Sequence, residues 1–220
     1  MKDELRKTLE QGIGKIDPSL LKDPVLKRLT RLFDEIELFN PVYSLVNAQG
    51  EDLVVRHILD CLAPVPLMKA AAPEGLGEMA DLGSGSGLPG LVLASALEDS
   101  RFSLVERMGR RAGFLRNTVA AMGLSDRADV VQKDLSMVQD SYDALTFRAF
   151  RPFKDIISDL DRILRPGGFI FAYKSSDENI REELDVVSSY AGSRFSCDVM
   201  DYGVPFLDAR RRLLVLRREG

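Results

Sequence analysis

Residues 81–90 read Asp-Leu-Gly-Ser-Gly-Ser-Gly-Leu-Pro-Gly, and this run constrains the fold more than any other part of the chain. It continues a short apolar segment, residues 79–82, that is typical of a buried strand, and it leads into a helical stretch at about 89–97. Alternating glycines let the backbone turn tightly and let a ligand come close to it. The free N–H groups at the start of the next helix favour an anionic group. The run therefore predicts a strand, a ligand-binding turn and a helix.

The spacing of the glycines separates two kinds of nucleotide-binding loop. A dinucleotide fingerprint places glycine at the first, third and sixth positions. Here Gly87 is at the fifth position and Leu88 at the sixth. The pattern acid-x-Gly-x-Gly-x-Gly instead resembles motif I of class I S-adenosylmethionine-dependent methyltransferases. An ordinary strand-to-helix turn is the competing interpretation, because a lone glycine-rich loop is a weak signal.

Short apolar runs alternate with helical stretches after residue 75. The expected strands are 79–82, 102–106, 129–132, 143–147, 168–173, 195–202 and 212–216, and the expected helices are at about 89–97, 109–122, 152–163 and 177–190. Strand and helix in alternation imply an α/β fold, with a mostly parallel seven-stranded sheet and helices on both faces. The short connector between the last two strands predicts that these two pair antiparallel.

The sequence pattern in the first third of the chain is typical of helices. Apolar residues recur at three- and four-residue steps over residues 20–38, which is the helical period. Pro41 is expected to end that helix, because proline disfavours helical geometry in the residue before it. A further helix is expected over about 51–62, ended by Pro64 and Pro66.

The composition fits one globular unit. Apolar residues make up 45% of the chain, which is too many for a chain that stays unfolded. The net charge of −4 excludes a uniformly basic nucleic-acid coat protein. We divide this unit into an N-terminal helical extension, residues 1–75, and an S-adenosylmethionine-binding methyltransferase domain, residues 76–220.

Several other classes of protein are not expected. The first residues carry charges of both signs and lead into no apolar run, unlike a signal peptide. No stretch approaches the roughly 18–20 apolar residues of a membrane span. Two isolated cysteines, Cys61 and Cys197, and a single histidine do not form a metal site, and they fit a reducing cytoplasm.

Three further features support the methyltransferase interpretation over an ordinary turn. Glu106 ends the second expected strand, where its carboxylate could accept both ribose hydroxyls of an adenosine. Asp134 follows the third strand, near where an adenine ring would lie. Residues 164–168, Leu-Arg-Pro-Gly-Gly, lead into the fifth strand and resemble a turn common in these enzymes.

Six motifs then narrow the class. They are Arg-His-Ile-Leu-Asp at 56–60, Leu-Pro-Gly at 88–90, Leu-Val-Glu-Arg at 104–107, Arg-Arg-Ala-Gly-Phe-Leu at 110–115, Arg-Ala-Phe at 148–150, and Lys174 at the end of the fifth strand. Together they resemble the bacterial RsmG family, formerly called glucose-inhibited division protein B, over about residues 29–218. The resemblance implies methylation of N7 of a guanine in small-subunit (16S) ribosomal RNA, in the cytoplasm, with S-adenosylmethionine as cofactor.

The two resemblances also imply site residues. The candidates for the cofactor are Asp81, Gly83, Gly85, Leu88, Glu106, Asp134, Leu135, Ser136 and Arg148. His57 and Lys174 are candidates for the substrate. Ser136 replaces the glutamate usual in the family and Ser175 the usual glycine, which indicates a divergent member.

The chemistry of the methyl acceptor leaves more than one function open. Guanine N7 has a free lone pair at neutral pH, so alignment is needed and no general base is expected; no catalytic residue is assigned. Cys61 and Cys197 are interpreted as structural, and not as the nucleophile of cytosine C5 methylation. Residues 147–150 read Phe-Arg-Ala-Phe, unlike the Asn/Asp-Pro-Pro-aromatic motif of exocyclic amine methylation. A methyltransferase for another substrate and a non-enzymatic ribosome-assembly factor with a vestigial cofactor pocket both stay open.

Arginines cluster in spite of the net negative charge. The clusters are Arg101, Arg107, Arg110, Arg111 and Arg116; Arg148, Arg151 and Lys154; and Arg210, Arg211, Arg212, Arg217 and Arg218. Several could line one rim of the cofactor cleft and contact RNA phosphates. For any one arginine, a solvated surface is the simpler interpretation. We select Arg110, Arg111 and Arg210 as candidate RNA contacts and predict no oligomeric state.

Overall fold

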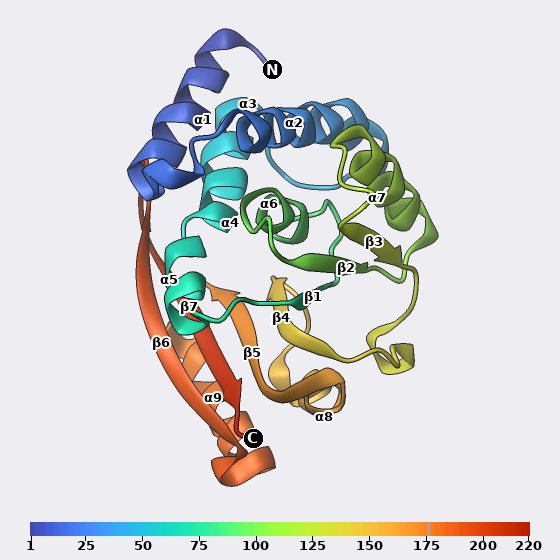
Figure 1. Ribbon diagram of the computed structural model, residues 1–220, viewed down its shortest axis with the longest axis vertical. Helices are drawn as coiled ribbons and strands as arrows, with labels where there is room; N and C mark the ends of the chain where they lie inside the picture. The colour runs from blue at the N-terminus through green and yellow to red at the C-terminus, as the bar shows by residue number, and fades with distance from the viewer. Residues whose placement is uncertain (176) are drawn as a thin grey trace.

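A computed structural model describes residues 1–175 and 177–220 of the chain. Seven strands form one sheet at its centre: β1 (Glu78–Leu82), β2 (Arg101–Val105), β3 (Ala128–Val131), β4 (Tyr142–Arg148), β5 (Leu164–Lys174), β6 (Phe195–Val204) and β7 (Leu207–Arg218). Their spatial order is β3-β2-β1-β4-β5-β7-β6 (Figure 1). The first five strands pair parallel, and β7 pairs antiparallel with both β5 and β6. The predicted α/β fold is confirmed, including the antiparallel final pair.

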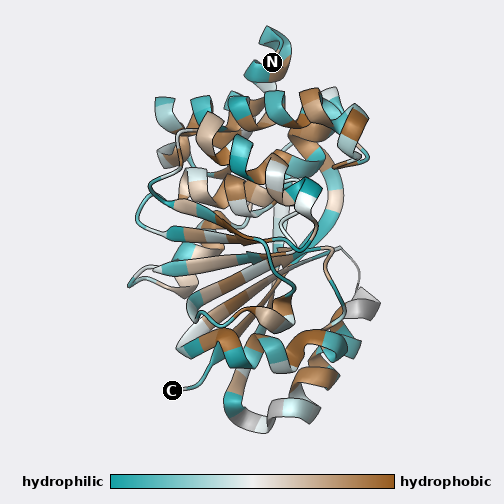
Figure 2. Cartoon of the chain, turned by 90° about the vertical axis from the view of Figure 1, so that its right-hand side faces the viewer, coloured by the Kyte–Doolittle hydropathy of each residue, from teal (hydrophilic) through white to brown (hydrophobic). Residues whose placement is uncertain are grey.

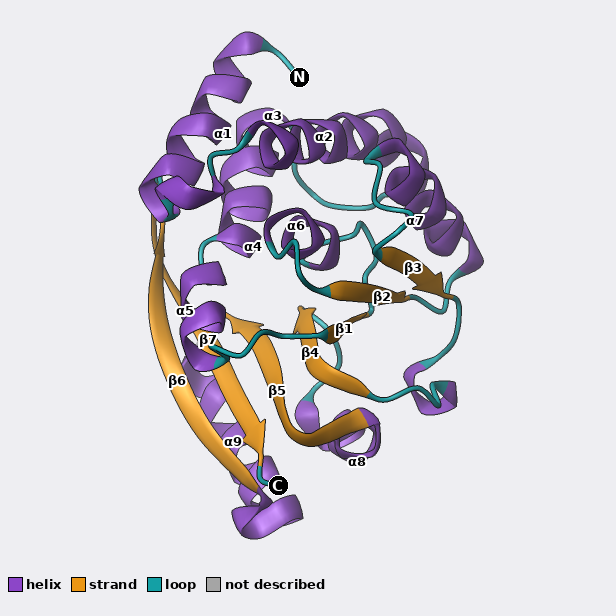
Figure 3. Ribbon diagram, in the orientation of Figure 1, coloured by secondary structure: helices purple, strands orange, loops and turns teal. Residues whose placement is uncertain are grey.

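Helices cover both faces of the sheet (Figures 2 and 3). They are α1 (Asp3–Ile16), η1 (Pro18–Leu20), α2 (Asp23–Tyr43), α3 (Gly50–Leu53), η2 (Val54–Leu59), α4 (Asp60–Leu62), α5 (Val65–Ala71), α6 (Gly90–Ala96), α7 (Gly109–Ala121), η3 (Leu135–Met137), α8 (Phe153–Ile163), α9 (Asp177–Ala191) and η4 (Gly192–Arg194). The α2 helix packs against α6 and α7 on one face, and α8 packs against α9 on the other.

The core follows from the two-residue period of the strands. In β5, Phe171 and Tyr173 point into the cluster shared with the N-terminal helices, whereas Ile170 and Ala172 point into the cluster under α8 and α9. A strand that is buried on both faces has a continuous run of apolar residues, and this run is the reason that the sequence predicts β5.

The N-terminal extension is helical, as expected, but the helix end predicted at Pro41 was wrong. Helix α2 runs through Pro41 to Tyr43 and ends at Ser44, whose φ is +49°. Phe39 stacks on Tyr43 and meets the edge of Phe114, at ring distances of 5.6 and 5.7 Å, so side-chain packing holds the last turn in helical form.

The helix expected over about 51–62 is confirmed: the helical residues run from Gly50 to Leu62 through α3, η2 and α4, and a turn follows at residues 63–64. A separate helix, α5, begins directly after this turn. Pro64 caps α5, and Pro66 lies in the first turn of that helix. A proline there loses no intrahelical hydrogen bond, because the first N–H groups of a helix have no partner within it.

The extension shares its core with the rest of the chain. Leu9 and Leu29 belong to the same buried cluster as Leu91 and Phe114. The boundary at residue 75 stays a prediction. None of the helices in the described ranges is long and apolar enough to cross a membrane.

Candidate active site

The order of the strands reverses between β1 and β4, since β2 follows β1 on one side and β5 follows β4 on the other. Open α/β sheets bind ligands at the carboxyl ends of the strands at such a point. The glycine loop leaves β1 there, and residues 149–152 leave β4. The ring of Phe150 lies on Gly83, where a Cβ would be 2.4 Å from its Cδ2. The two loops are therefore in direct contact.

The shape of the glycine loop is set by backbone conformation and backbone hydrogen bonds. Gly83, Gly85 and Gly87 have φ values of +70°, +54° and +82°, which favour glycine. The N–H groups of Gly83 and Ser84 donate to the carbonyl of Val105, at 2.9 and 3.1 Å, and tie the loop to the end of β2. The predicted turn is present. Phe150 covers Gly83 and Leu91 covers Gly87, whereas the space against Gly85 is open.

Asp81 is almost fully buried beneath this loop. Its Oδ2 accepts a hydrogen bond from the N–H of Gly90 at 3.0 Å, and a Cβ on Gly90 would lie 2.5 Å from that oxygen. Its Oδ1 has no hydrogen-bond partner among the described residues. Burial raises the pKa of Asp81 to about 7. The free oxygen can accept from a cationic ligand group, which would offset the cost of burying the charge.

Glu106 connects the glycine loop to the segment after β2. One carboxylate oxygen accepts from the N–H of Gly85 at 3.1 Å, and the other accepts from the N–H of Met108 at 2.8 Å. An ionised carboxylate has about four acceptor positions, so two remain for ligand hydroxyls. The side chain orders the loop in addition to the ribose contact that the sequence predicts.

The segment after β3 is held by Asp134. Its Oδ1 accepts from the N–H and the hydroxyl of Ser136, at 3.2 and 3.1 Å, and these bonds lower the pKa of Asp134. Arg151 from the loop after β4 lies 3.5 Å from the same oxygen. Leu135 is buried, as is Leu88 in the glycine loop.

Arg148, the last residue of β4, is held by the helix η2–α4. Its guanidinium donates to the carbonyl of Arg56 at 3.3 Å and to Oδ2 of Asp60 at 3.2 Å. It also lies 2.7 Å from Nδ1 of His57. Because arginine can only donate, Nδ1 accepts and the proton of a neutral ring is on Nε2. Burial and the Arg148 charge lower the pKa of His57 to about 4, so the ring is neutral near pH 7.

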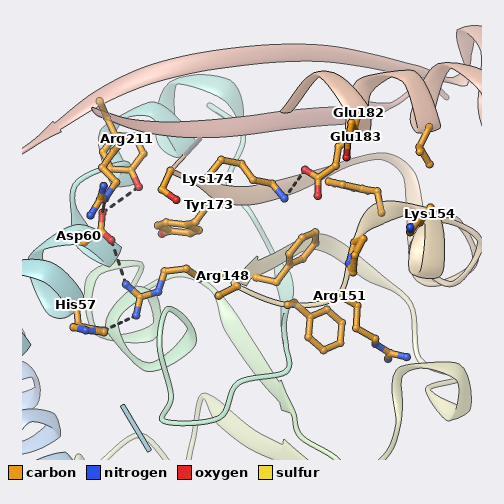
Figure 4. Close-up of a pocket in the computed structure, with 18 of the residues that line it drawn as sticks. His57, Asp60, Arg148, Arg151, Lys154, Tyr173, Lys174, Glu182, Glu183 and Arg211 are labelled. Carbon is orange, nitrogen blue, oxygen red and sulfur yellow. Dashed lines mark hydrogen bonds and ion pairs between the residues drawn. The ribbon is translucent and has the colours of Figure 1, made fainter. Parts of the chain in front are cut away.

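Asp60 joins three distant parts of the chain (Figure 4). Besides Arg148 it accepts from Arg211 at 3.1 Å and from the hydroxyl of Tyr202 at 3.3 Å. Its side chain is 6% exposed. The helix that carries Asp60 has a π-helical turn at η2, a distortion that is frequent at functional sites. Sequence reasoning assigned Asp60 to a motif but did not identify this junction.

A cavity of about 710 Å³ opens beside this network, between the ends of β4 and β5 and helix α9. The residues lining it include His57, Asp60, Arg148, Phe150, Lys174, Glu183, Tyr202 and Arg211. Its size is in the range of small-molecule and nucleotide pockets. Phe150 both lines the cavity and covers Gly83, so the cavity adjoins the glycine loop.

The remaining candidates for RNA contact are dispersed. Arg110 is exposed on α7, whereas Arg111 reaches the glycine loop, with Nη1 3.9 Å from a Cβ placed on Gly85. Arg210 is exposed and does not line the cavity; Arg211 does. Arg211 shares a face of β7 with Leu213 and Val215, which belong to the buried cluster beside the N-terminal helices. The two-residue alternation was the signal that could have identified it.

These residues fit S-adenosylmethionine. Gly85 leaves space for a ligand at the backbone, Oδ1 of Asp81 has no hydrogen-bond partner among the described residues and suits an ammonium group, and Glu106 has free acceptor positions for ribose hydroxyls. In the described part of the chain, no group of three or more His, Cys, Asp or Glu side chains could hold a metal ion.

Solved structures share this fold. The chain superposes on an S-adenosylmethionine-dependent O-methyltransferase from Thermotoga maritima with a TM-score of 0.55, at 16% identity over 86% of this chain and 71% of that one. It superposes on an rRNA methylase from Streptococcus thermophilus with a TM-score of 0.54, at 17% identity over 71% and 97%. The fold and the site together define the class, S-adenosylmethionine-dependent methyltransferases.

Sequence relatives identify the family. Residues 25–207 match the GidB family, described as rRNA small subunit methyltransferase G. The proteins named ribosomal RNA small subunit methyltransferase G from Treponema pallidum and Stenotrophomonas maltophilia are 33% and 35% identical, over 94% and 95% of this chain and 92% and 93% of theirs. The chain belongs to this family and is a methyltransferase that uses S-adenosylmethionine.

Proposed function

We propose that this protein transfers a methyl group from S-adenosylmethionine to N7 of a guanine in small-subunit (16S) ribosomal RNA. The observation that carries the proposal is the contact of Phe150 with Gly83, which places the large cavity next to the cofactor cradle. Family membership supports the RNA, and the motif resemblance supports the N7 position.

The reaction requires the protein to align guanine N7 with the methyl group of the cofactor. The bound cofactor supplies an electrophilic sulfonium methyl group. Guanine N7 needs no deprotonation, and positioning alone can contribute roughly 7–11 kcal/mol to a reaction barrier. The side chains around the cavity suit this task, since Arg148, Lys174 and Arg211 donate hydrogen bonds and His57 is neutral with Nδ1 already occupied.

We assign the site in two parts. The cofactor is held by Asp81, Gly83, Gly85 and Glu106, by the backbone at Leu88 and Leu135, by Asp134 and Ser136, and by Arg148. The RNA is contacted by His57, Lys174 and Arg110, and also by Arg111 beside the glycine loop and Arg210 outside the cavity.

Residues 1–75 form the helical extension and residues 76–220 the catalytic domain in this proposal. Because the extension carries His57 and Asp60, it completes the cavity and is not an independent module. We expect the protein in the cytoplasm, since its proposed substrate is ribosomal RNA or the small ribosomal subunit.

The test combines the protein with labelled S-adenosylmethionine and either naked small-subunit RNA or assembled small subunits. We expect label on one guanine, and we expect no label when that base is 7-deazaguanine, which lacks the N7 lone pair. Label on a protein or small molecule would support the other methyltransferase function, and cofactor binding without methyl transfer to any component would support a vestigial pocket.

A further inference from the structure

Lys174 and Glu183 form an ion pair on the wall of the cavity, away from the Asp60 network (Figure 4). Nζ of Lys174, at the end of β5, lies 2.5 Å from Oε2 of Glu183 on α9. Their side chains are only 14% and 11% exposed. Oε2 of Glu183 is buried, and within residues 1–175 and 177–220 its contact is the ion pair with Lys174, which does not have hydrogen-bond geometry. A carboxylate has about four acceptor positions, so this one contact leaves most of them unfilled. A nearly buried carboxylate with unused acceptor capacity is costly, and a ligand that donates hydrogen bonds would stabilise it.

The pair presents a donor beside an acceptor. The Watson–Crick edge of guanine presents the complement, the acceptor O6 beside the donors N1–H and N2–H₂. Adenine presents a donor at N6 and an acceptor at N1, so it would meet the ion pair with the wrong polarity. A base whose Watson–Crick edge faced this pair would therefore be favoured if it were guanine and disfavoured if it were adenine.

The location of the pair suits a base taken out of its stack. Enzymes that modify a base hold it in a pocket by hydrogen bonds to its Watson–Crick edge and by contact with aromatic side chains. Phe147, Phe150 and Phe153 line this cavity, and Lys174 Nζ lies 5.2 Å from the centre of the Phe153 ring. When the Watson–Crick edge is engaged, N7 on the neighbouring edge of the base stays free for the methyl group.

We propose that Glu183, paired with Lys174, reads the Watson–Crick edge of the target guanine: Glu183 accepts from N1–H and N2–H₂, and Lys174 donates to O6. This inference rests on the proposed function. It assigns the base specificity to the cavity wall formed by α9, and not to the arginines outside the cavity.

The experiment compares two RNAs once the methylated guanine has been mapped. One carries guanine at that position, and the other carries inosine, which keeps N7, O6 and N1–H but lacks the exocyclic amine. A hydrogen bond to a charged group is lost with inosine, so kcat/KM of the unaltered protein should fall about tenfold or more. Glu183→Gln should lose at least about tenfold on guanine RNA, and its guanine-to-inosine ratio should approach one.

The control is Asp185→Asn, which removes one negative charge from an exposed position of the same helix. It should keep the rate on guanine RNA and the guanine-to-inosine ratio. Calorimetric affinity for the cofactor should stay unchanged in Glu183→Gln, since Glu183 is not part of the glycine loop.

The outcomes separate this inference from the function on which it rests. Equal methylation of guanine and inosine by the unaltered protein, or an unchanged ratio in Glu183→Gln, overturns the inference and leaves guanine N7 methylation standing. Methylation at an atom other than N7 overturns the proposed function. Equal methylation of the two RNAs by the unaltered protein overturns the inference even if the variant is unstable, whereas the assignment to Glu183 depends on the ratio in Glu183→Gln.

Discussion

The two halves of the site are built differently. The cofactor cradle at the ends of β1 and β2 is made of backbone, with three glycines at positive φ and a loop tied to Val105. The cavity beyond β4 and β5 is made of side chains that meet around Asp60 from η2–α4, β4 and the β6–β7 hairpin. The cradle should therefore be sensitive to the presence of any side chain, and the cavity to the loss of particular charges.

The strongest test of the cradle is Gly85→Val. A Cβ there would meet only ordinary contacts, the nearest being the carbonyl oxygen of Gly83 at 3.6 Å, so the fold has space for it. The φ of +54° and the side chain in the path of the ligand should nevertheless abolish cofactor binding in calorimetry. Gly113→Ala, in open space on α7, should bind normally. Normal binding by the valine variant would show that the ligand does not approach this backbone.

The corresponding test of the cavity is Asp60→Ala. It leaves Arg148 and Arg211, each less than one-fifth exposed, without their shared carboxylate. Removing one partner of a buried pair costs about 3–5 kcal/mol, which denaturant unfolding would measure. Asp52→Ala breaks an exposed pair with Arg56 and should cost less than about 1 kcal/mol. Equal costs would mean that Asp60 is not a structural junction.

Glu106 combines features of both halves of the site, because its side chain holds the backbone of the glycine loop in place. Loss of hydrogen bonds to its charge, worth about 1.5–3 kcal/mol, should weaken cofactor binding roughly ten- to a hundredfold in Glu106→Ala. Glu106→Gln keeps one acceptor oxygen and should lie between. A change below about twofold in the alanine variant would indicate that the carboxylate does not contact the ligand.

Asp81 should give the cradle a pH dependence. Its pKa in the folded protein is about 7, above the ordinary 3.8, so folding favours the protonated form. Its contribution to stability is fully present below about pH 4 and is lost as pH rises to about 7. Asp81→Asn should reduce the fall in the free energy of unfolding between pH 5 and pH 8. An identical pH profile in the variant would contradict the shift.

The smallest effect is expected outside both halves, at Arg110 on α7. A phosphate contact there should contribute about 0.7 to the log–log slope of RNA affinity against salt for single-stranded RNA. Arg110→Ala should flatten the slope by about that amount. Arg101→Ala, at the opposite, amino end of β2, should not change it. Arg111 is a poorer probe of RNA binding. Its side chain lies beside Gly85, so a substitution there would change the binding of the cofactor as well as that of RNA.

Local sequence predicted the elements that local physics controls. The strands were placed to within a few residues, except that β5 and β7 begin earlier than expected, because apolar runs and turn residues act over short distances. Pro41 was misjudged because its effect depends on Phe39 meeting Phe114, a contact between helices distant in sequence. Packing of this kind overrides local preference.

The sequence by itself determined the sheet, the glycine turn and the place of Asp81 and Glu106, because a strand and the loop that follows it are neighbours in the chain. Only the tertiary structure decided that Arg211 and not Arg210 enters the cavity, and that Asp60 joins Arg148 across 88 residues of sequence. It alone brought Lys174 next to Glu183. The physical reason is that a nearly buried charge needs a partner at contact distance, and chain folding supplies that partner from remote segments.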